Sequence, residues 1–317
     1  MCSEEFLIIA NPVAGKGRGR RRTQAVVSRL EAAGKRVEVR WTERPGQARE
    51  LAAAAVKEGW PRIVAAGGDG TVHDVANALA GTEAVLGLLP LGRANDLGRE
   101  LGLSGQPAAA VQVLLHGRPR RIDLGCINGE YFCTVATLGF DAEVSRLVHE
   151  NRVPFSSSLT YIYGMLYALC YYRCQPVRLE GDFGTLEETI LLTATGNTGS
   201  YGGGMKIAPH AVVDDGRLSL CIIRAVPRTT VLFLFHRVFS GRHVTHPAVR
   251  LQHARSFSIQ ATSPLWIYAD GEAICQTPAT VSVVPGALQV MVPAEGSRGD
   301  GEKPLAAGGP GRGEGSP

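Results

Sequence analysis

The stretch from Arg62 to Leu79, RIVAAGGDGTVHDVANAL, constrains most strongly how this chain can fold. Its first residues, Arg62 to Ala66, are an apolar run that predicts a short buried strand. The glycines that follow permit a sharp turn and a close approach of the backbone to a ligand. Apolar residues then recur at helical spacing, which predicts a helix capped by Thr71 or Asp69. A strand, a glycine turn and a helix start form an anion site, because free amides and the positive end of the helix dipole point outward together.

A carboxylate stands inside this predicted anion site. Asp69 lies among groups that attract anions, although a bare carboxylate repels phosphate. A divalent metal or a bridging water between the carboxylate and the phosphate would resolve this conflict. The pattern therefore favours a nucleotide with magnesium. A glycine turn that serves only the local backbone geometry is the alternative.

The five residues from Gly67 to Thr71 resemble the GGDGT signature of the diacylglycerol kinase catalytic fold, which is similar to that of sphingosine kinases and NAD kinases. The resemblance covers about residues 5 to 293 and narrows to the soluble bacterial lipid kinases of the diacylglycerol kinase type. It implies transfer of phosphate from ATP, with Mg²⁺, to the hydroxyl of diacylglycerol or a related lipid alcohol. An NAD kinase-like enzyme and a nucleotide-binding module without catalysis are the alternatives.

The order of predicted elements changes near residue 122. Before it, strands and helices alternate, which predicts an α/β domain with a parallel sheet and right-handed crossovers, as in the Rossmann variant of the resembled family. After it, many short strands at modest spacing predict an antiparallel β-sandwich. The predicted domains are a nucleotide-binding domain (1–122, completed by a returning segment at about 286–293), a β-rich lipid- and metal-binding domain (123–285) and a polar, disordered tail (294–317).

Three turns of the first domain are expected to meet at the carboxyl ends of the parallel strands, where such sheets bind ligands. The segment from Pro90 to Arg99 resembles a second family motif, PxGTxNDxAR, in which Arg93 replaces a Thr or Ser that bonds phosphate. An arginine can reach the same phosphate with its charged fork. Alternatively, Asn95 and Asp96 merely cap the next helix. The residues predicted to bind ATP are Asn11, Thr42, Gly67, Gly68, Asp69, Gly70, Thr71, Arg93 and Asn95.

A DG turn in the second domain resembles the family's APxAxxxDGxL stretch. The resemblance implies that Asp215, with backbone carbonyls near Val212 and Arg217, holds magnesium, and Asp96 is assigned to the metal as well. Carboxylate and carbonyl oxygens suit a hard cation, whereas a plain turn before a strand is the alternative. Four acids are thus expected to gather around metal in one crevice between two lobes: Asp69, Asp96, Asp215 and Glu272.

The sequence Asp270-Gly271-Glu272 resembles the family's DGE motif. It implies that Glu272 is the general base that takes the proton of the acceptor hydroxyl, with Asp270 orienting either the base or the metal. A second stretch resembles the NxxxYGGG loop that borders the interdomain cleft. Its predicted substrate-cleft residues are Asn197, Tyr201, Gly202 and Gly203.

The composition fits a lipid partner met at a membrane surface. The net charge of +4 and pI near 8.7 favour anionic partners only mildly, and no nucleic-acid partner is predicted. The longest apolar stretch, Leu159 to Tyr172, has only fourteen residues, fewer than the roughly 20 that a spanning helix needs. Aromatic residues near cations in Thr160 to Arg173 and Val231 to His243 suit a membrane interface, although core helices explain them as well.

The cysteines and the start of the chain bear on its compartment. Seven cysteines form no CxxC pair, which favours reduced thiols and gives no zinc site. The first residues lack the basic segment and cleavage site of a secretory signal. We therefore predict a cytoplasmic protein that visits the inner face of the membrane, and a homodimer is left open.

Overall fold

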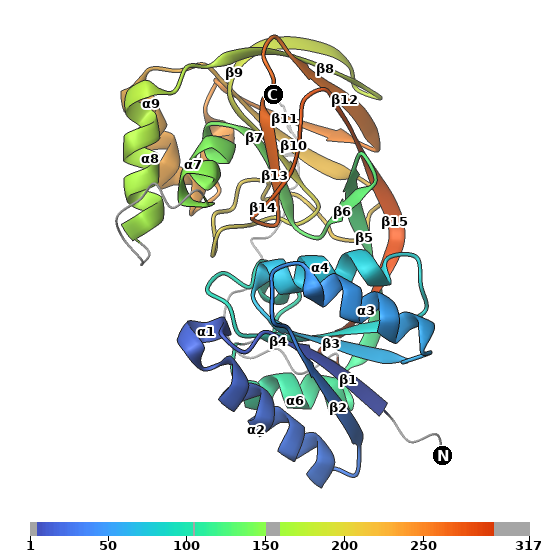
Figure 1. Cartoon of the computed structure of the whole chain (residues 1–317). Coiled ribbons are helices and arrows are strands. Elements are labelled where there is room, and N and C mark those ends of the chain that lie inside the picture. Colours follow the sequence, from blue (N-terminus) through green and yellow to red (C-terminus); the bar gives the residue numbers. More distant parts are fainter. Residues whose placement is uncertain (1–4, 104, 150–158, 295–317) are drawn as a thin grey trace, which may run out of the picture.

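The computed structural model describes residues 5–103, 105–149 and 159–294, which form two lobes (Figure 1). The predicted disordered tail therefore lies outside the described residues, except for Ala294. The strand that precedes this tail joins the lobes and ends at Val292.

The first lobe is the predicted α/β unit. Its sheet has the order β15-β4-β3-β1-β2, and every neighbouring pair in it is parallel. The strands are β1 (Glu5–Ala10), β2 (Arg36–Trp41), β3 (Arg62–Gly67), β4 (Val85–Pro90) and β15 (Ala279–Val292). The helices are α1 (Ala14–Gly17), α2 (Gly19–Ala32), α3 (Gln47–Lys57), α4 (Asp69–Leu79), α5 (Asp96–Glu100) and α6 (Pro107–His116).

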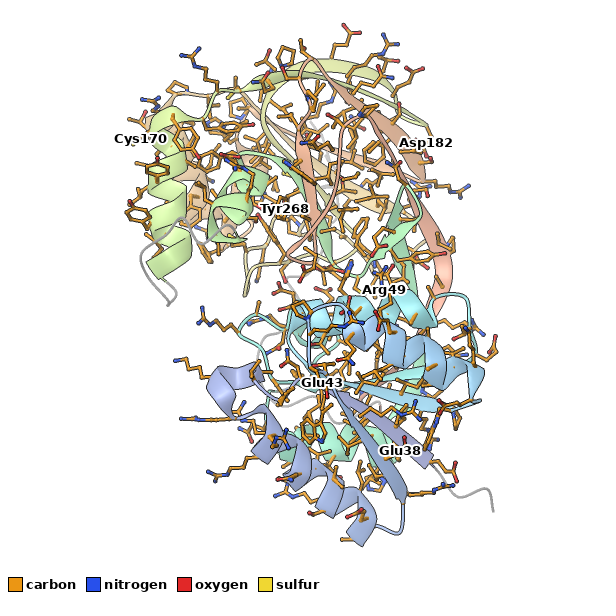
Figure 2. All side chains as sticks on the ribbon, in the orientation of Figure 1. Glu38, Glu43, Arg49, Cys170, Asp182 and Tyr268 are labelled. Carbon is orange, nitrogen blue, oxygen red and sulfur yellow. The ribbon has the colours of Figure 1, made fainter. Side chains whose placement is uncertain are left out.

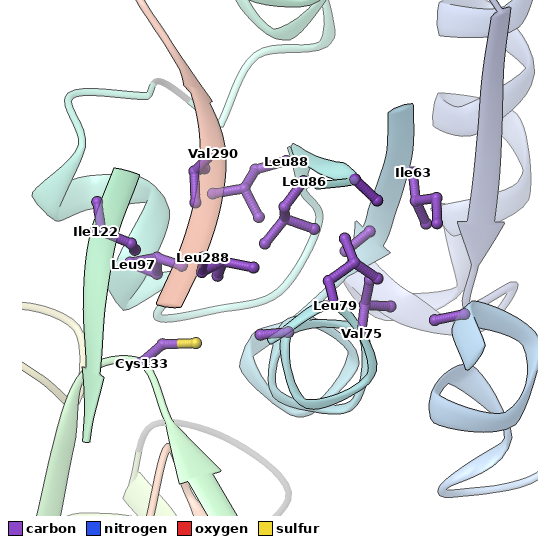
Figure 3. Close-up of a cluster of buried hydrophobic side chains, with 14 of the residues drawn as sticks. Ile63, Val75, Leu79, Leu86, Leu88, Leu97, Ile122, Cys133, Leu288 and Val290 are labelled. Carbon is purple, nitrogen blue, oxygen red and sulfur yellow. The ribbon is translucent and has the colours of Figure 1, made fainter. Parts of the chain in front are cut away.

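Alternate residues of β1 face the two layers of helices. Leu7 and Ile9 belong to one buried cluster with α3 and α4, whereas Phe6 and Ile8 belong to another with α2 and α6. A strand covered on both faces must be apolar throughout, which explains the continuous run in the sequence. Figure 3 shows the first cluster continuing from α4 past β4 to Leu288 of β15 and to Cys133 of the second lobe.

The second lobe is the predicted β-sandwich-like domain, built mainly from antiparallel pairs. Its strands are β6 (Glu130–Phe132), β7 (Val135–Gly139), β8 (Gln175–Gly181), β9 (Gly184–Gly196), β10 (Leu218–Arg224), β11 (Val249–Ala254), β12 (Ser256–Ala261), β13 (Trp266–Ala269) and β14 (Glu272–Gln276). Its helices are α7 (Phe140–His149), α8 (Leu159–Tyr171), α9 (Arg228–Val238) and the 3₁₀ turn η1 (Arg242–Thr245).

Two long strands join the lobes. β5 (Arg118–Ile127) pairs antiparallel with β15, and the register shifts between Val284 and Leu288. Beyond this shift, β15 pairs parallel with β4 of the first sheet. The returning segment predicted at about 286–293 lies in the second half of β15. The lobes are thus connected by a continuous ladder and not by a loose linker.

Candidate functional site

The two glycine-containing turns of the first lobe are joined by their backbones. Leu91 N donates to Gly67 O at 2.8 Å, and Gly92 N donates to the side chain of Asn95 at 2.8 Å. A Cβ on Gly92 would stand 2.5 Å from Gly68 Cα, so the two turns approach each other more closely than a side chain at Gly92 would permit. Asn95 has φ of 49°, a left-handed conformation that Asn tolerates. The second motif is therefore held in place by the first.

Asp69 fastens this arrangement. Its carboxylate accepts hydrogen bonds from Asn95 N at 3.0 Å and Asp96 N at 2.7 Å. Burial raises the pKa of Asp69, and these amide bonds oppose the rise. The N-cap residue of α4 is Gly68, with no side-chain cap, so the prediction that Thr71 or Asp69 caps this helix is wrong. The Asp69 carboxylate is committed to the neighbouring loop instead.

A cavity of about 620 Å³ opens beside this turn. That volume lies within the roughly 300–1,000 Å³ typical of small-molecule sites. Asn11, Thr42, Gly70 and Thr71, four of the residues predicted to bind ATP, line the cavity together with the predicted base Glu272. Arg93 is exposed. The predicted ATP-binding residues that are not part of the lining are Gly67, Gly68, Asp69, Arg93 and Asn95.

Glu272 from the second lobe stands directly over the first turn of α4. A Cβ built on Gly70 would lie 2.5 Å from Glu272 Oε1. Glycine at this position therefore leaves the room that the carboxylate occupies. The start of the helix and the predicted base share one cavity, although they are about 200 residues apart in the sequence.

Three members of an ionic chain between the lobes line the same cavity as Glu272. His73 of α4 is buried, with Nδ1 3.1 Å from Asp270 Oδ2 and Nε2 3.1 Å from Glu130 Oε1. Arg49 of α3 pairs in turn with Glu130, and Nη1 donates to Oε2 at 3.0 Å. Asp74, one residue after His73, also lines the cavity.

The charges in this chain stabilise one another. Burial alone would lower the pKa of His73, but the hydrogen bonds with Asp270 and Glu130 raise it to about 10. Burial would raise the pKa of Glu130, but His73 and Arg49 lower it to about 2. The pKa of Asp270 is lowered as well, because His73 and nearby donors outweigh its burial. His73 is therefore an imidazolium at neutral pH.

Asp270 is fixed by the second lobe. Its carboxylate accepts hydrogen bonds from Cys133 N at 2.8 Å and from Thr134 N at 2.8 Å and Oγ1 at 2.6 Å. Its φ of 52° starts the tight turn that brings Glu272 around to α4. These bonds fit the predicted orienting role of Asp270.

Sequence reasoning missed His73, Glu130 and Arg49. One signal was available: His73 and Asp74 follow Gly70 by three and four residues, so all three share one face of α4. No pattern in the sequence indicated which acids these side chains would meet.

Asp96 forms a second bridge between the lobes. Its carboxylate accepts Gly202 N at 2.6 Å and Gly203 N at 2.9 Å. Burial, together with the nearby negative charge of Asp69, raises the pKa of Asp96 to about 6. Both oxygens of Asp96 bind amides, so its carboxylate joins the lobes, and the metal-ligand role predicted for Asp96 stays a prediction. It also makes Gly202 and Gly203 part of the bridge.

The remaining residues of the predicted substrate cleft are largely internal. Asn197 is fully buried, and its Nδ2 donates to Asp123 O at 2.8 Å and Cys133 O at 2.9 Å. Asn197 is thus a cross-link between strands, which corrects its predicted place at the cleft surface. Tyr201 hydrogen-bonds Asp141, and burial raises the pKa of its hydroxyl.

The loop predicted to hold metal rests on Asp123. Asp123 Oδ2 accepts Gly216 N at 2.7 Å, and Oδ1 accepts Gly286 N at 2.8 Å. Asp215 accepts a hydrogen bond from Arg217 N at 2.9 Å, whereas its neighbour Asp214 is paired with Arg120. The loop thus leaves the Asp215 carboxylate exposed, and a carboxylate is an oxygen donor that suits a hard cation.

The four predicted acids do not form a metal cluster. Within residues 5–103, 105–149 and 159–294, no three His, Cys, Asp or Glu side chains are grouped so as to hold a metal ion. Asp69 and Asp96 are bound to amides, Asp215 lies outside the cavity lining, and Glu272 lines the cavity. The expectation of one four-acid centre is therefore wrong.

None of the helices in the described part of the chain has the length and apolar character that crossing a membrane requires.

Known proteins match this architecture along most of the chain. The family model for the diacylglycerol kinase catalytic domain matches residues 5–127, and that for the YegS C-terminal NAD kinase beta sandwich-like domain matches residues 134–292. A protein named diacylglycerol kinase from Mycobacterium tuberculosis is 38% identical over 296 residues, which cover 91% of this chain and 95% of that protein.

Two further matches extend the comparison. A probable lipid kinase YegS-like from Pseudomonas aeruginosa is 35% identical over 282 residues, which cover 88% of this chain and 92% of that protein. The crystal structure of a putative diacylglycerol kinase from Bacillus anthracis has a TM-score of 0.76 at 23% identity, covering 92% and 97% of the two chains. That structure shares the two-lobed fold.

Proposed function

Because the chain belongs to the family of the diacylglycerol kinase catalytic domain and the YegS C-terminal domain, we propose that it is an ATP-dependent lipid kinase. Its acceptor is the hydroxyl of diacylglycerol or a related lipid alcohol. The observation that carries this proposal is the position of Glu272 over Gly70, inside the cavity that Asn11, Thr42 and Thr71 also line. The names of the relatives support a lipid acceptor over NAD.

In this proposal the first lobe holds the nucleotide. The amides at the start of α4 and the positive end of its dipole attract the phosphates. Asn11 and Thr42, at the ends of β1 and β2, add polar groups at the same edge. Phosphoryl transfer needs positioning and charge neutralisation more than covalent chemistry from the protein.

Glu272 accepts the proton of the lipid hydroxyl as that oxygen attacks the terminal phosphorus of ATP, and the bond from this phosphorus to the bridging oxygen breaks, so that ADP leaves with the electron pair. Its turn is held by Asp270, and Asp270 is held by His73 and the amides of the second lobe. A base fixed in this way stays within reach of the helix start and loses little freedom in the transition state.

A divalent metal, taken to be Mg²⁺, belongs to this proposal as an ion that would order the loop around Asp215, which lies outside the cavity lining. Among the described residues we assign it to Asp215 with the carbonyls of Val212 and Arg217, because this loop offers the oxygen donors that Mg²⁺ prefers. The enzyme would act in the cytoplasm, with transient contact at the inner membrane face.

The test is transfer of labelled phosphate from ATP to diacylglycerol in mixed micelles. Wild-type protein should label the lipid, and Glu272→Gln should lower the rate by about 100-fold or more with ATP affinity kept within about twofold. Glu31→Gln on the exposed face of α2 is the matched control. Labelling of NAD in place of lipid would favour the NAD kinase alternative, and ATP binding without transfer to any lipid would favour a binding module.

A further inference from the structure

Two helices of the second lobe turn large apolar side chains toward solvent. We define the α8–α9 face by Ile162, Leu166 and Tyr167 of α8 and by Leu232, Phe233 and Phe239 of α9 and its C-cap. These side chains are exposed, and Tyr167 and Phe233 are each 51% exposed. The opposite sides of the two helices are ordinary core, since Met165, Ala168, Val231, Leu234 and Val238 are buried in one cluster.

The start of α9 meets the end of α8. Arg228 at the start of α9 donates to Cys170 O near the end of α8 at 2.6 Å. Figure 1 shows α8 along the outer side of the second lobe, and Figure 2 places Cys170 at that outer edge. Scattered exposed apolar residues are normal, but several large exposed apolar side chains on two helices that meet favour an interaction surface.

The aromatic rings of α8 form a ladder along this surface. Tyr163 and Tyr167 stack with ring centroids 6.1 Å apart, and Tyr167 meets Tyr171 at 5.1 Å. Tyrosine combines an apolar ring with a polar tip, which suits the boundary between lipid chains and water. Tyr163, Tyr167 and Tyr171 are all exposed, so their rings can meet an apolar layer.

The charged side chains within the two helices are all basic. Neither α8 nor α9 contains an Asp or Glu, whereas Arg173, Arg228 and Arg242 are exposed beside them. Arg237 lies over the Phe233 ring at 5.1 Å. The acid that α8 touches, Glu143, accepts the Tyr171 hydroxyl and is paired with Arg146. Apolar rings surrounded by arginines complement an anionic lipid surface.

We propose that the α8–α9 face docks this protein onto anionic membranes. This inference rests on the proposed lipid kinase function, because docking supplies access to a substrate that stays in the bilayer. The rings of Tyr167 and Phe233 enter the headgroup layer, and the surrounding arginines bind lipid phosphates. In the view of Figure 1, α8 lies on the same side of the molecule as α1. Val13, the N-cap residue of α1, lines the cavity.

The experiment is sedimentation of the full chain with vesicles of phosphatidylcholine alone or with phosphatidylglycerol, in the absence of ATP. We expect binding to the phosphatidylglycerol vesicles, and at least about tenfold weaker binding for Tyr167→Ser/Phe233→Ser, because two large side chains lose their apolar burial. Trp266→Ser, which removes a 41% exposed ring from β13, is the matched control and should bind like wild type. Arg242→Gln should reduce the salt sensitivity of binding.

Activity on two substrates separates this proposal from the proposed function. The double variant should lose phosphorylation of diacylglycerol in vesicles but keep that of a short-chain, water-dispersed diacylglycerol. Wild-type binding to vesicles without activity on either substrate would uphold the face and overturn the kinase assignment. Equal vesicle binding by wild type and double variant would overturn the face. A wild-type dimer that the double variant converts to a monomer, with vesicle binding unchanged, would instead assign the face to a second copy of the chain.

Discussion

His73 Nδ1 lies 3.1 Å from Asp270 Oδ2, and the two residues come from different lobes. His73 sits one helical turn after Gly70 on α4, and Asp270 starts the turn that carries Glu272. The ion pair therefore connects the two parts of the proposed site directly. Because both side chains are buried, the attraction between their charges is screened little by water.

His73→Gln should lower the turnover number about 10- to 100-fold, as loss of a supporting hydrogen bond does in other sites, and should change the KM for ATP little. Glutamine can keep one hydrogen bond but carries no charge. His116→Gln, at the exposed end of α6, is the control. Steady-state kinetics with mixed micelles would measure the effect, and an unchanged turnover number would remove His73 from the positioning role.

The same pair predicts a pH dependence of stability. The pKa of His73 is raised in the folded protein from 6.5 to about 10. Its stabilisation is therefore complete below pH 6.5 and is lost as the pH rises toward 10. At pH 6, His73→Gln should lower the free energy of unfolding by on the order of 3 kcal/mol, and the difference from wild type should shrink steadily above pH 6.5. Urea unfolding at several pH values measures it, and a difference that grows with pH would contradict the assignment.

Gly70→Ala should separate stability from catalysis. Alanine favours a helix by about 1 kcal/mol over glycine, so the melting temperature should hold or rise. The added Cβ would meet Glu272 Oε1, however, and should displace the base and lower turnover by about 100-fold. Gly105→Ala is the control, since its Cβ would lie 4.0 Å from Pro90 O. Retained activity in Gly70→Ala would show that Glu272 need not occupy this position.

Asp215→Asn tests the proposed metal loop. Removing one carboxylate should raise the Mg²⁺ concentration for half-maximal activity by about tenfold or more. Asp214→Asn is the matched control, because the Asp214 carboxylate is already paired with Arg120. Magnesium titrations of both variants give the comparison, and identical curves would place the metal elsewhere.

Local patterns predicted the first lobe well. The spacing of apolar residues and the positions of the glycines located β3, α4 and the GGDGT turn, because both signals depend on residues that are adjacent in the sequence. The same reasoning predicted the β-rich second lobe. The prediction that Thr71 or Asp69 caps α4 was wrong. The Asp69 carboxylate binds the amide of Asn95 instead, and only the tertiary structure brings Asn95 within reach.

The sequence by itself determined the layers of the fold, the strand-turn-helix unit at residues 62–79 and the identity of the acid at position 272. Tertiary structure alone decided which partners those residues meet: Glu272 with Gly70, His73 with Asp270, and Asp96 with the amides of Gly202 and Gly203. The physical reason is range. Strand and helix signals act within a few residues, whereas each of these contacts joins segments more than 100 residues apart, which become neighbours only once β5 and β15 have aligned the lobes.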